Sequence, residues 1–292
     1  MRELREALGR LVFVYGALTW DKPFLGPLFT FLSHHPPGTY VELPLYVKMV
    51  LAWMRGRLEN RRAHAVRPRP RLEDAVFRVD AKAEGMTVAV GGWCPVRDAR
   101  GQIQKGRSPW FSLRLDERTA PWAFCRGLPA RAISALELLA STVALVLLTP
   151  AAEKLTGQRG TVAVTGFTDS QVASNVLRRG MTTSFPLCCV AMELAAQLEH
   201  RDAKLCLEWT PREENREADA LADGRTEGFS PALRAGQDFT DIGWLVLPDL
   251  MAAGLQFHGA VKRPVAGSAV PGSDTAAGKR RRESRLRDRE PW

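Results

Sequence analysis

The sequence lacks the features of several common classes of protein. Its five cysteines are an odd number with no C-x-x-C spacing, which argues against a disulfide framework and a cysteine zinc site. The longest apolar run, residues 138–148, is too short to span a bilayer, so we expect no membrane partner. A polymerase Y-x-D-D motif is missing, and we expect no polymerase activity. These absences favour a reducing compartment and an intracellular location, cytoplasmic or nuclear.

The charge of the chain favours an anionic partner. The 292 residues carry a formal net charge of +9, and the sequence pI is about 9.7. Nucleic acid is the simplest partner for such a balance. Part of the charge is local, because residues 279–292 hold seven Lys and Arg against three acids. This basic cluster is also typical of a nuclear-localisation signal, and the sequence leaves both roles open.

Apolar periodicity and chain breakers predict an α/β protein. Three strands in succession are followed by alternating helices and strands, which favours a mixed sheet, antiparallel on one side and parallel on the other, covered by helices. The predicted strands are 75–81, 86–93, 109–115, 161–167 and 204–210, and the predicted helices are 129–150, 170–180, 185–201 and 210–223.

Composition divides the chain into five parts. A helical segment, residues 1–66, precedes an Arg- and Pro-rich linker, residues 67–74, which is either a solvated hinge or a phosphate contact. The sheet domain spans 75–224. An apolar C-terminal extension, 225–265, and a disordered basic tail, 266–292, complete the predicted organisation.

Four carboxylates stand at points where this topology could bring them together. Asp80 ends the first predicted strand, and Asp169 follows closely on the fourth. We expect these two strands to be neighbouring and parallel, so both acids should emerge at the same sheet edge. Glu137 lies on the apolar face of the long helix, where a carboxylate is costly unless it is paired or bound to a cation. Asp219 lies on the last helix, among alanines.

Carboxylates held close together repel one another, and divalent cations relieve that repulsion. Oxygen ligands without His or Cys favour Mg²⁺ or Mn²⁺ over zinc. Two such ions about 4 Å apart suit the in-line cleavage of a phosphodiester. Each acid also has an ordinary interpretation: a turn residue for Asp80, a helix cap for Asp169 and a surface acid for Asp219.

These stretches resemble the four acidic motifs of ribonuclease H domains, most closely those at the C-terminus of retroelement reverse transcriptases. The resemblance covers about residues 73–224, and its most specific part is Asn215 followed by Ala218 to Leu221. Residues 1–66 are similar to the connection or thumb-like segment that precedes this domain in retroelements. The matching stretches are FRVDAKAEGMTVAVGGW, SALELLA, GFTDSQVASNVLRRG and LEWTPREENREADALAD.

The resemblance implies a ribonuclease H-like five-stranded mixed sheet flanked by helices and preceded by a small helical segment. It implies a metal-dependent endoribonuclease that cuts the RNA strand of RNA–DNA hybrids, with a polymerase domain of a parent polyprotein as a further partner. Two Mg²⁺ or Mn²⁺ ions would be held by Asp80, Glu137, Asp169 and Asp219. The nucleic-acid-binding candidates are Gly85, Ser170, Gln171, Asn175, Arg178, Arg179 and Arg212.

One departure from the family pattern lies in the loop before the last helix. Many members have a His there, whereas this chain offers Arg212 and Glu213. The main alternative is a catalytically silent ribonuclease H-like module that binds nucleic acid. A nuclease of the same broad fold acting on DNA and a plain interaction protein are further alternatives, although an acid at Glu137 together with Asp219 favours ribonuclease H.

Removal of residues 279–292 should weaken binding to nucleic acid and flatten its salt dependence, without stopping catalysis. Each lost phosphate contact removes about 0.9 from the slope of log affinity against log salt. Fluorescence anisotropy at several salt concentrations measures this slope, and an unchanged slope would show that the segment makes no phosphate contact.

Overall fold

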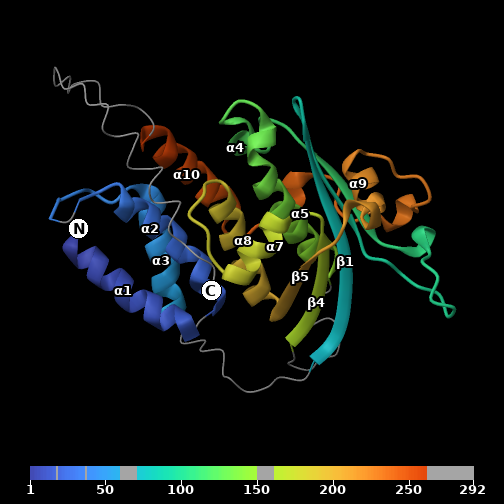
Figure 1. The fold of residues 1–292 in the computed structure, drawn as a ribbon, viewed down its shortest axis with the longest axis horizontal. Coiled ribbons are helices and arrows are strands. Elements are labelled where there is room, and N and C mark those ends of the chain that lie inside the picture. Colours follow the sequence, from blue (N-terminus) through green and yellow to red (C-terminus); the bar gives the residue numbers. More distant parts are fainter. Residues whose placement is uncertain (18, 37, 60–70, 150–160, 262–292) are drawn as a thin grey trace, which may run out of the picture. The chain divides into compact units, whose positions relative to one another are not determined.

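The computed structural model describes residues 1–17, 19–36, 38–59, 71–149 and 161–261 (Figure 1). The chain divides into two compact units, Met1–Gly259 and Ala260–Trp292. The first unit contains the sheet, its covering helices and the N-terminal helical segment. Of the second unit only the end of the last helix is described, so the predicted basic tail lies outside the described residues, as do residues 67–70 of the predicted linker.

The core of the first unit is a five-stranded sheet in the order β3-β2-β1-β4-β5. The first three strands pair antiparallel, and β1, β4 and β5 pair parallel. The prediction of a mixed five-stranded sheet flanked by helices is therefore confirmed. The strands are β1 (Arg71–Glu84), β2 (Thr87–Trp93), β3 (Trp110–Leu115), β4 (Thr161–Thr168) and β5 (Ala203–Trp209).

Helices cover both faces of the sheet (Figure 1). One stretch of the described chain, Pro129–Leu148, has the length and apolar composition of a helix that could cross a membrane. About two-thirds of it is buried inside the protein, as is usual for the core helix of a globular domain. It comprises a 3₁₀ turn and α5. One face is covered by α5 (Ile133–Leu148), α7 (Gln171–Arg179) and α8 (Leu187–His200), and the other by α9 (Arg216–Ala222).

Two adjacent glycines in β2 allow this packing on both faces. A Cβ atom at Gly91 would collide with the backbone of Leu221 and Ala222, so α9 lies directly against the strand. A Cβ atom at Gly92 would lie 2.7 Å from the ring of Phe111, on the opposite face. Close approach of α9 to the sheet therefore depends on the absence of a side chain at Gly91.

The N-terminal segment is helical, as predicted, and packs against α8. The hydroxyl of Tyr46 lies 3.3 Å from the sulfur of Cys188 and 3.2 Å from that of Cys189. Arg57 pairs with the buried Asp21 at 3.2 Å and also with Glu199 of α8. The helices are α1 (Arg2–Ala17), η1 (Thr19–Phe24), α2 (Leu25–Ser33) and α3 (Leu45–Glu59).

The segment after α9 returns to α8 and ends in a further helix. Glu193 of α8 is fully buried, and its carboxylate accepts backbone N–H bonds from Leu245, Val246 and Leu247 at 2.8 to 3.2 Å. These donors lie at the start of α10, so Glu193 satisfies N–H groups that the helix cannot satisfy itself. The elements are η5 (Pro231–Leu233), η6 (Phe239–Asp241) and α10 (Leu247–Val261).

The main differences from the sequence prediction lie in β1 and in the last predicted helix. Strand β1 begins at Arg71, within the predicted linker, and continues to Glu84, so Asp80 lies inside the strand rather than at its end. The pairing of β1 with β4 ends at Arg78, whereas the pairing of β1 with β2 continues from Arg78 to Glu84. The predicted helix 210–223 is interrupted, with a 3₁₀ turn, Arg212–Glu214, before α9.

Replacement of Glu193 by Ala should lower the free energy of unfolding by about 3 kcal/mol, because buried N–H groups at the start of α10 lose a charged acceptor. Asp249→Ala removes an exposed acid from the first turn of the same helix and should cost less than about 1 kcal/mol. Urea unfolding measures both values. Equal losses would contradict the capping role of Glu193.

Candidate active site

The parallel register of β1 and β4 places two predicted acids at the same sheet edge. The last aligned pair of these strands is Arg78 with Phe167. Asp80 and Asp169 each stand two residues beyond this pair, Asp80 still within β1 and Asp169 directly after the end of β4. Asp80 remains paired with Gly91 of β2 on its other side, which holds its backbone in the sheet. The expected convergence of these two acids is therefore observed.

Glu137 reaches the same edge from α5. Ligand oxygens of Asp80, Glu137 and Asp169 all lie within 4.8 Å of one another, and the first two side chains are buried. Two groups orient Glu137: the hydroxyl of Thr168, 3.5 Å from its Oε2, and the backbone N–H of Ala81. Three of the four predicted catalytic acids thus form one compact cluster.

Burial and mutual repulsion change the protonation of this cluster. Burial raises the pKa of Asp80 to about 8, and the charges of Asp169 and Asp219 add to the effect. The pKa of Glu137 is also well above its ordinary value, first because of burial and then because of Asp80 and Asp169. Such acids are stabilised in their ionised form by a cation. The all-oxygen donor set fits Mg²⁺ or Mn²⁺.

Asp219 lies near the cluster but contacts arginines. Its Oδ1 accepts a bond of 2.6 Å from Arg212, and its Oδ2 accepts one of 3.4 Å from Arg225. Its charge raises the pKa of Asp80, so the two acids are close enough to interact. The fourth predicted acid is therefore positioned beside the other three, with its own charge neutralised by protein cations.

Two buried or backbone contacts that the sequence did not reveal orient the acids. Asn215, which is almost fully buried, donates from Nδ2 to the carbonyl of Val79 at 2.8 Å and so fixes the start of α9 beside Asp80. Trp209 at the end of β5 donates from Nε1 to the carbonyl of Asp169 at 3.0 Å. In the sequence Asn215 stands out only as part of the last acidic motif, and no sequence signal marks Trp209.

The predicted nucleic-acid-binding residues fall into separate places. Ser170 caps α7 by accepting a bond from the backbone of Ala173, with exposed Gln171 beside it. Asn175 accepts a bond of 2.6 Å from Arg178. Gly85, with a φ of +57°, forms the exposed β1–β2 turn about 16 Å along the strand from Asp80. Of the seven candidates, Arg212 directly contacts one of the four acids.

Asn175 and Arg179 share a cavity beside the start of α5. It has a volume of about 410 Å³, and its lining also includes Arg126 and Arg131. Asn175 and Arg179 lie on α7, which begins two residues after Asp169. Two residues that line this basic cavity are therefore near the acidic cluster in sequence.

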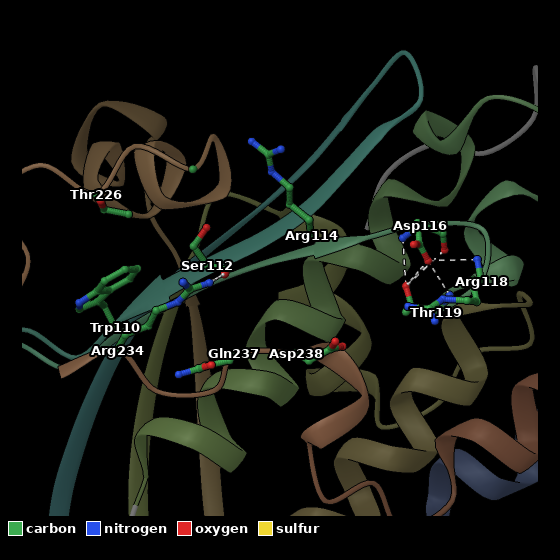
Figure 2. Close-up of a pocket in the computed structure, with 11 residues that line it drawn as sticks. Trp110, Ser112, Arg114, Asp116, Arg118, Thr119, Thr226, Arg234, Gln237 and Asp238 are labelled. Atoms are coloured by element: carbon green, nitrogen blue, oxygen red, sulfur yellow. Dashed lines mark hydrogen bonds between the residues drawn. The ribbon is translucent and has the colours of Figure 1, made fainter. Parts of the chain in front are cut away.

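A second polar cavity lies at the outer edge of β3 (Figure 2). It has a volume of about 370 Å³, and none of the predicted site residues lines it. Two of its charged groups bind within the protein: Arg234 donates to the carbonyl of Ser112 at 2.9 Å, and Asp116 accepts bonds from the backbone and hydroxyl of Thr119. We therefore place the candidate site at the acidic cluster.

Comparison with known proteins gives similarity only in structure. No family model matches the chain, and no curated protein matches its sequence. Solved structures include ribonuclease H1 from the halophilic archaeon Halobacterium salinarum, at 19% identity and a TM-score of 0.32, covering 52% of this chain and 97% of that one. The compost-derived LC11 ribonuclease H1 in complex with an RNA/DNA hybrid matches at 17% identity and a TM-score of 0.35, covering 52% and 96%.

A viral enzyme is also similar in part. The protease-reverse transcriptase of prototype foamy virus matches at 17% identity and a TM-score of 0.34, over 52% of this chain and 21% of that one. At these scores the neighbours support no conclusion on activity. The fold class therefore rests on the sheet order and pairing, and the candidate site rests on the convergence of the acids.

In the absence of divalent ions, the protein should lose stability as the pH rises. Because the folded pKa of Asp80 is about 8, above the ordinary 3.8, its contribution to stability is present below pH 3.8 and is lost as the pH rises through 8. The free energy of unfolding of the wild type should fall by on the order of a few kcal/mol between pH 3.8 and pH 8, and Asp80→Asn should not show this fall. Urea unfolding in chelator across this range tests it, with exposed Asp249→Asn as control. Parallel profiles for wild type and Asp80→Asn would contradict the shift.

Proposed function

We propose that this protein is a metal-dependent endoribonuclease of the ribonuclease H type, which cuts the RNA strand of RNA–DNA hybrids. The observation that supports this most is the cluster of Asp80, Glu137 and Asp169 at the carboxyl edge of the parallel strands, with ligand oxygens within 4.8 Å. Buried carboxylates with raised pKa values are costly to keep together unless they serve a ligand.

Each acid has a role in this proposal. Asp80, Glu137 and Asp169 would hold the divalent cation, with Asp219 as a further ligand at the same edge. When bound, divalent cations activate a water nucleophile and stabilise the leaving oxygen of a phosphodiester. The chain orients its ligands in advance, because Thr168 and Ala81 contact Glu137 and Trp209 holds the backbone of Asp169.

Basic and polar groups beside the cluster would bind the sugar-phosphate backbone. Asn175 and Arg179 line the basic cavity next to α5, and exposed Arg178 is a further phosphate contact. Ser170, Gln171 and the turn at Gly85 would contact the minor groove, where the 2′-hydroxyl distinguishes RNA from DNA. Binding through phosphates and 2′-hydroxyls would be sensitive to salt and largely independent of sequence.

We further propose that the chain is part of a retroelement reverse transcriptase, with residues 1–66 as the connection-like segment and 75–224 as the ribonuclease H-like domain. Its partner would be the polymerase domain of the parent polyprotein. Three consecutive exposed apolar residues of α1 support such a partner, because Val12, Phe13 and Val14 are 43%, 87% and 38% exposed.

A specific observation favours the alternative of a catalytically silent nucleic-acid-binding module. Arg212 and Arg225 both pair with Asp219, the fourth predicted acid. A protein that had lost the use of its second cation could keep Asp219 in such an ion pair. Cleavage of a hybrid separates the two functions.

The test is cleavage of a uniformly labelled RNA–DNA hybrid in Mg²⁺, beside single-stranded RNA, duplex RNA and duplex DNA. Only the hybrid should be cut, and Asp169→Asn should reduce the rate by about 1,000-fold or more, because a ligand of the reacting centre is lost. Binding of the hybrid should stay within a few-fold of wild type.

Asp249→Asn is the matched control, because it removes an exposed carboxylate outside the cluster. It should cut at the wild-type rate. Cleavage that persists in both Asp80→Asn and Asp169→Asn would contradict the site. A folded wild type that binds the hybrid without cutting it would support the silent module instead.

A further inference from the structure

Arg212 occupies an unusual position for an exposed arginine. It lies in the 3₁₀ turn between β5 and α9, and its side chain is 74% exposed. Its Nη2 nevertheless lies 2.6 Å from Oδ1 of Asp219, the shorter of the two contacts that arginines make with this carboxylate. An exposed cation is therefore held directly at the edge of the acidic cluster.

The charge of Arg212 acts on more than one acid. Its pKa is raised first by the hydrogen bond and charge of Asp219, and then by the charges of Asp80 and Asp169. In turn, Arg212 opposes the rise in the pKa of Asp80. One guanidinium thus contacts Asp219, acts through its charge on Asp80 and Asp169, and partly replaces the positive charge that a divalent ion would provide there.

Arg225 differs from Arg212 although it also reaches Asp219. Its contact with Asp219 is longer, at 3.4 Å, and the same Nη2 donates to Asp223 at 2.8 Å. Asp223 therefore keeps Arg225 in place whether or not Asp219 is available. Among the side-chain contacts of the described residues, Arg212 depends on Asp219 alone, so it is the arginine that can be displaced.

We propose that Arg212 is an exchangeable counter-cation that competes with a divalent ion for Asp219 and so determines the ion concentration at which Asp219 becomes a ligand. The proposal rests on the proposed function in taking Asp219 as a metal ligand. The cluster of Asp80, Glu137 and Asp169 would fill first, because no protein cation contacts it as closely in the part of the chain that the structure describes.

The exposure of Arg212 limits the strength of this competition. Ion pairs between exposed side chains are weak, and releasing one changes an equilibrium by about fivefold at most. Loss of Arg212 should therefore lower the ion concentration needed at Asp219 by about this factor, without creating or abolishing a site. Displaced Arg212 would remain next to the cluster, where a phosphate of the substrate could accept its hydrogen bonds.

The experiment is direct titration of the protein with Mn²⁺, by calorimetry and by electron paramagnetic resonance of free Mn²⁺, without nucleic acid. Arg212→Gln should tighten the weaker Mn²⁺ site about fivefold and leave the tighter site within twofold. Arg225→Gln, which removes the same charge near Asp219, is the matched control and should change the weaker site less than twofold. Asp219→Asn should abolish the weaker site.

Two results would overturn the proposal. The first is that Arg212→Gln leaves the affinity of both Mn²⁺ sites unchanged. The second is that Arg225→Gln tightens the weaker site as much as Arg212→Gln does, which would show that any loss of positive charge near Asp219 has the same effect. The outcome is independent of catalysis, because Mn²⁺ binding is measured without substrate. Tightening in Arg212→Gln together with absent hybrid cleavage would support the proposal and reject only the proposed function.

Discussion

The parallel pairing of β1 and β4 is the constraint on which the candidate site depends. It places Asp80 and Asp169 two residues beyond the same register point, and the pairing of Asp80 with Gly91 of β2 also holds the backbone of Asp80. Glu137 then reaches them from the core helix α5, where its backbone is fixed by packing on both sides. The backbone holds together carboxylates that repel one another, and the cost appears in the raised pKa values of Asp80 and Glu137.

Helix α8 links the sheet domain to both ends of the first compact unit. Tyr46 and Arg57 of the N-terminal helices contact one part of it, and the buried Glu193 caps the start of α10 from another. The N-terminal helices are therefore packed against the sheet domain through polar contacts with α8. Helix α8 also packs against α5, the helix that bears Glu137.

The sheet and three of the four acids could be predicted because they follow from short-range patterns. Runs of apolar and β-branched residues predict the strands, and the order of strands and helices along the chain predicts the mixed sheet. Glu137 was recognisable because a carboxylate stood among apolar neighbours. The ion pair between Arg212 and Asp219 could not be predicted, because it depends on a long side chain in an irregular turn. The contacts of Asn215 and Trp209 required knowledge of which strands lie beside α9 and Asp169.

The central claim is that the acidic edge of the sheet holds divalent ions against the RNA strand of a hybrid. The most direct measurement is anomalous scattering from crystals of the protein with Mn²⁺ and an uncleavable RNA–DNA hybrid. We expect anomalous peaks among the carboxylates of Asp80, Glu137 and Asp169, with a phosphate of the RNA strand over them. Ions bound elsewhere, or the DNA strand lying over these acids, would contradict the account.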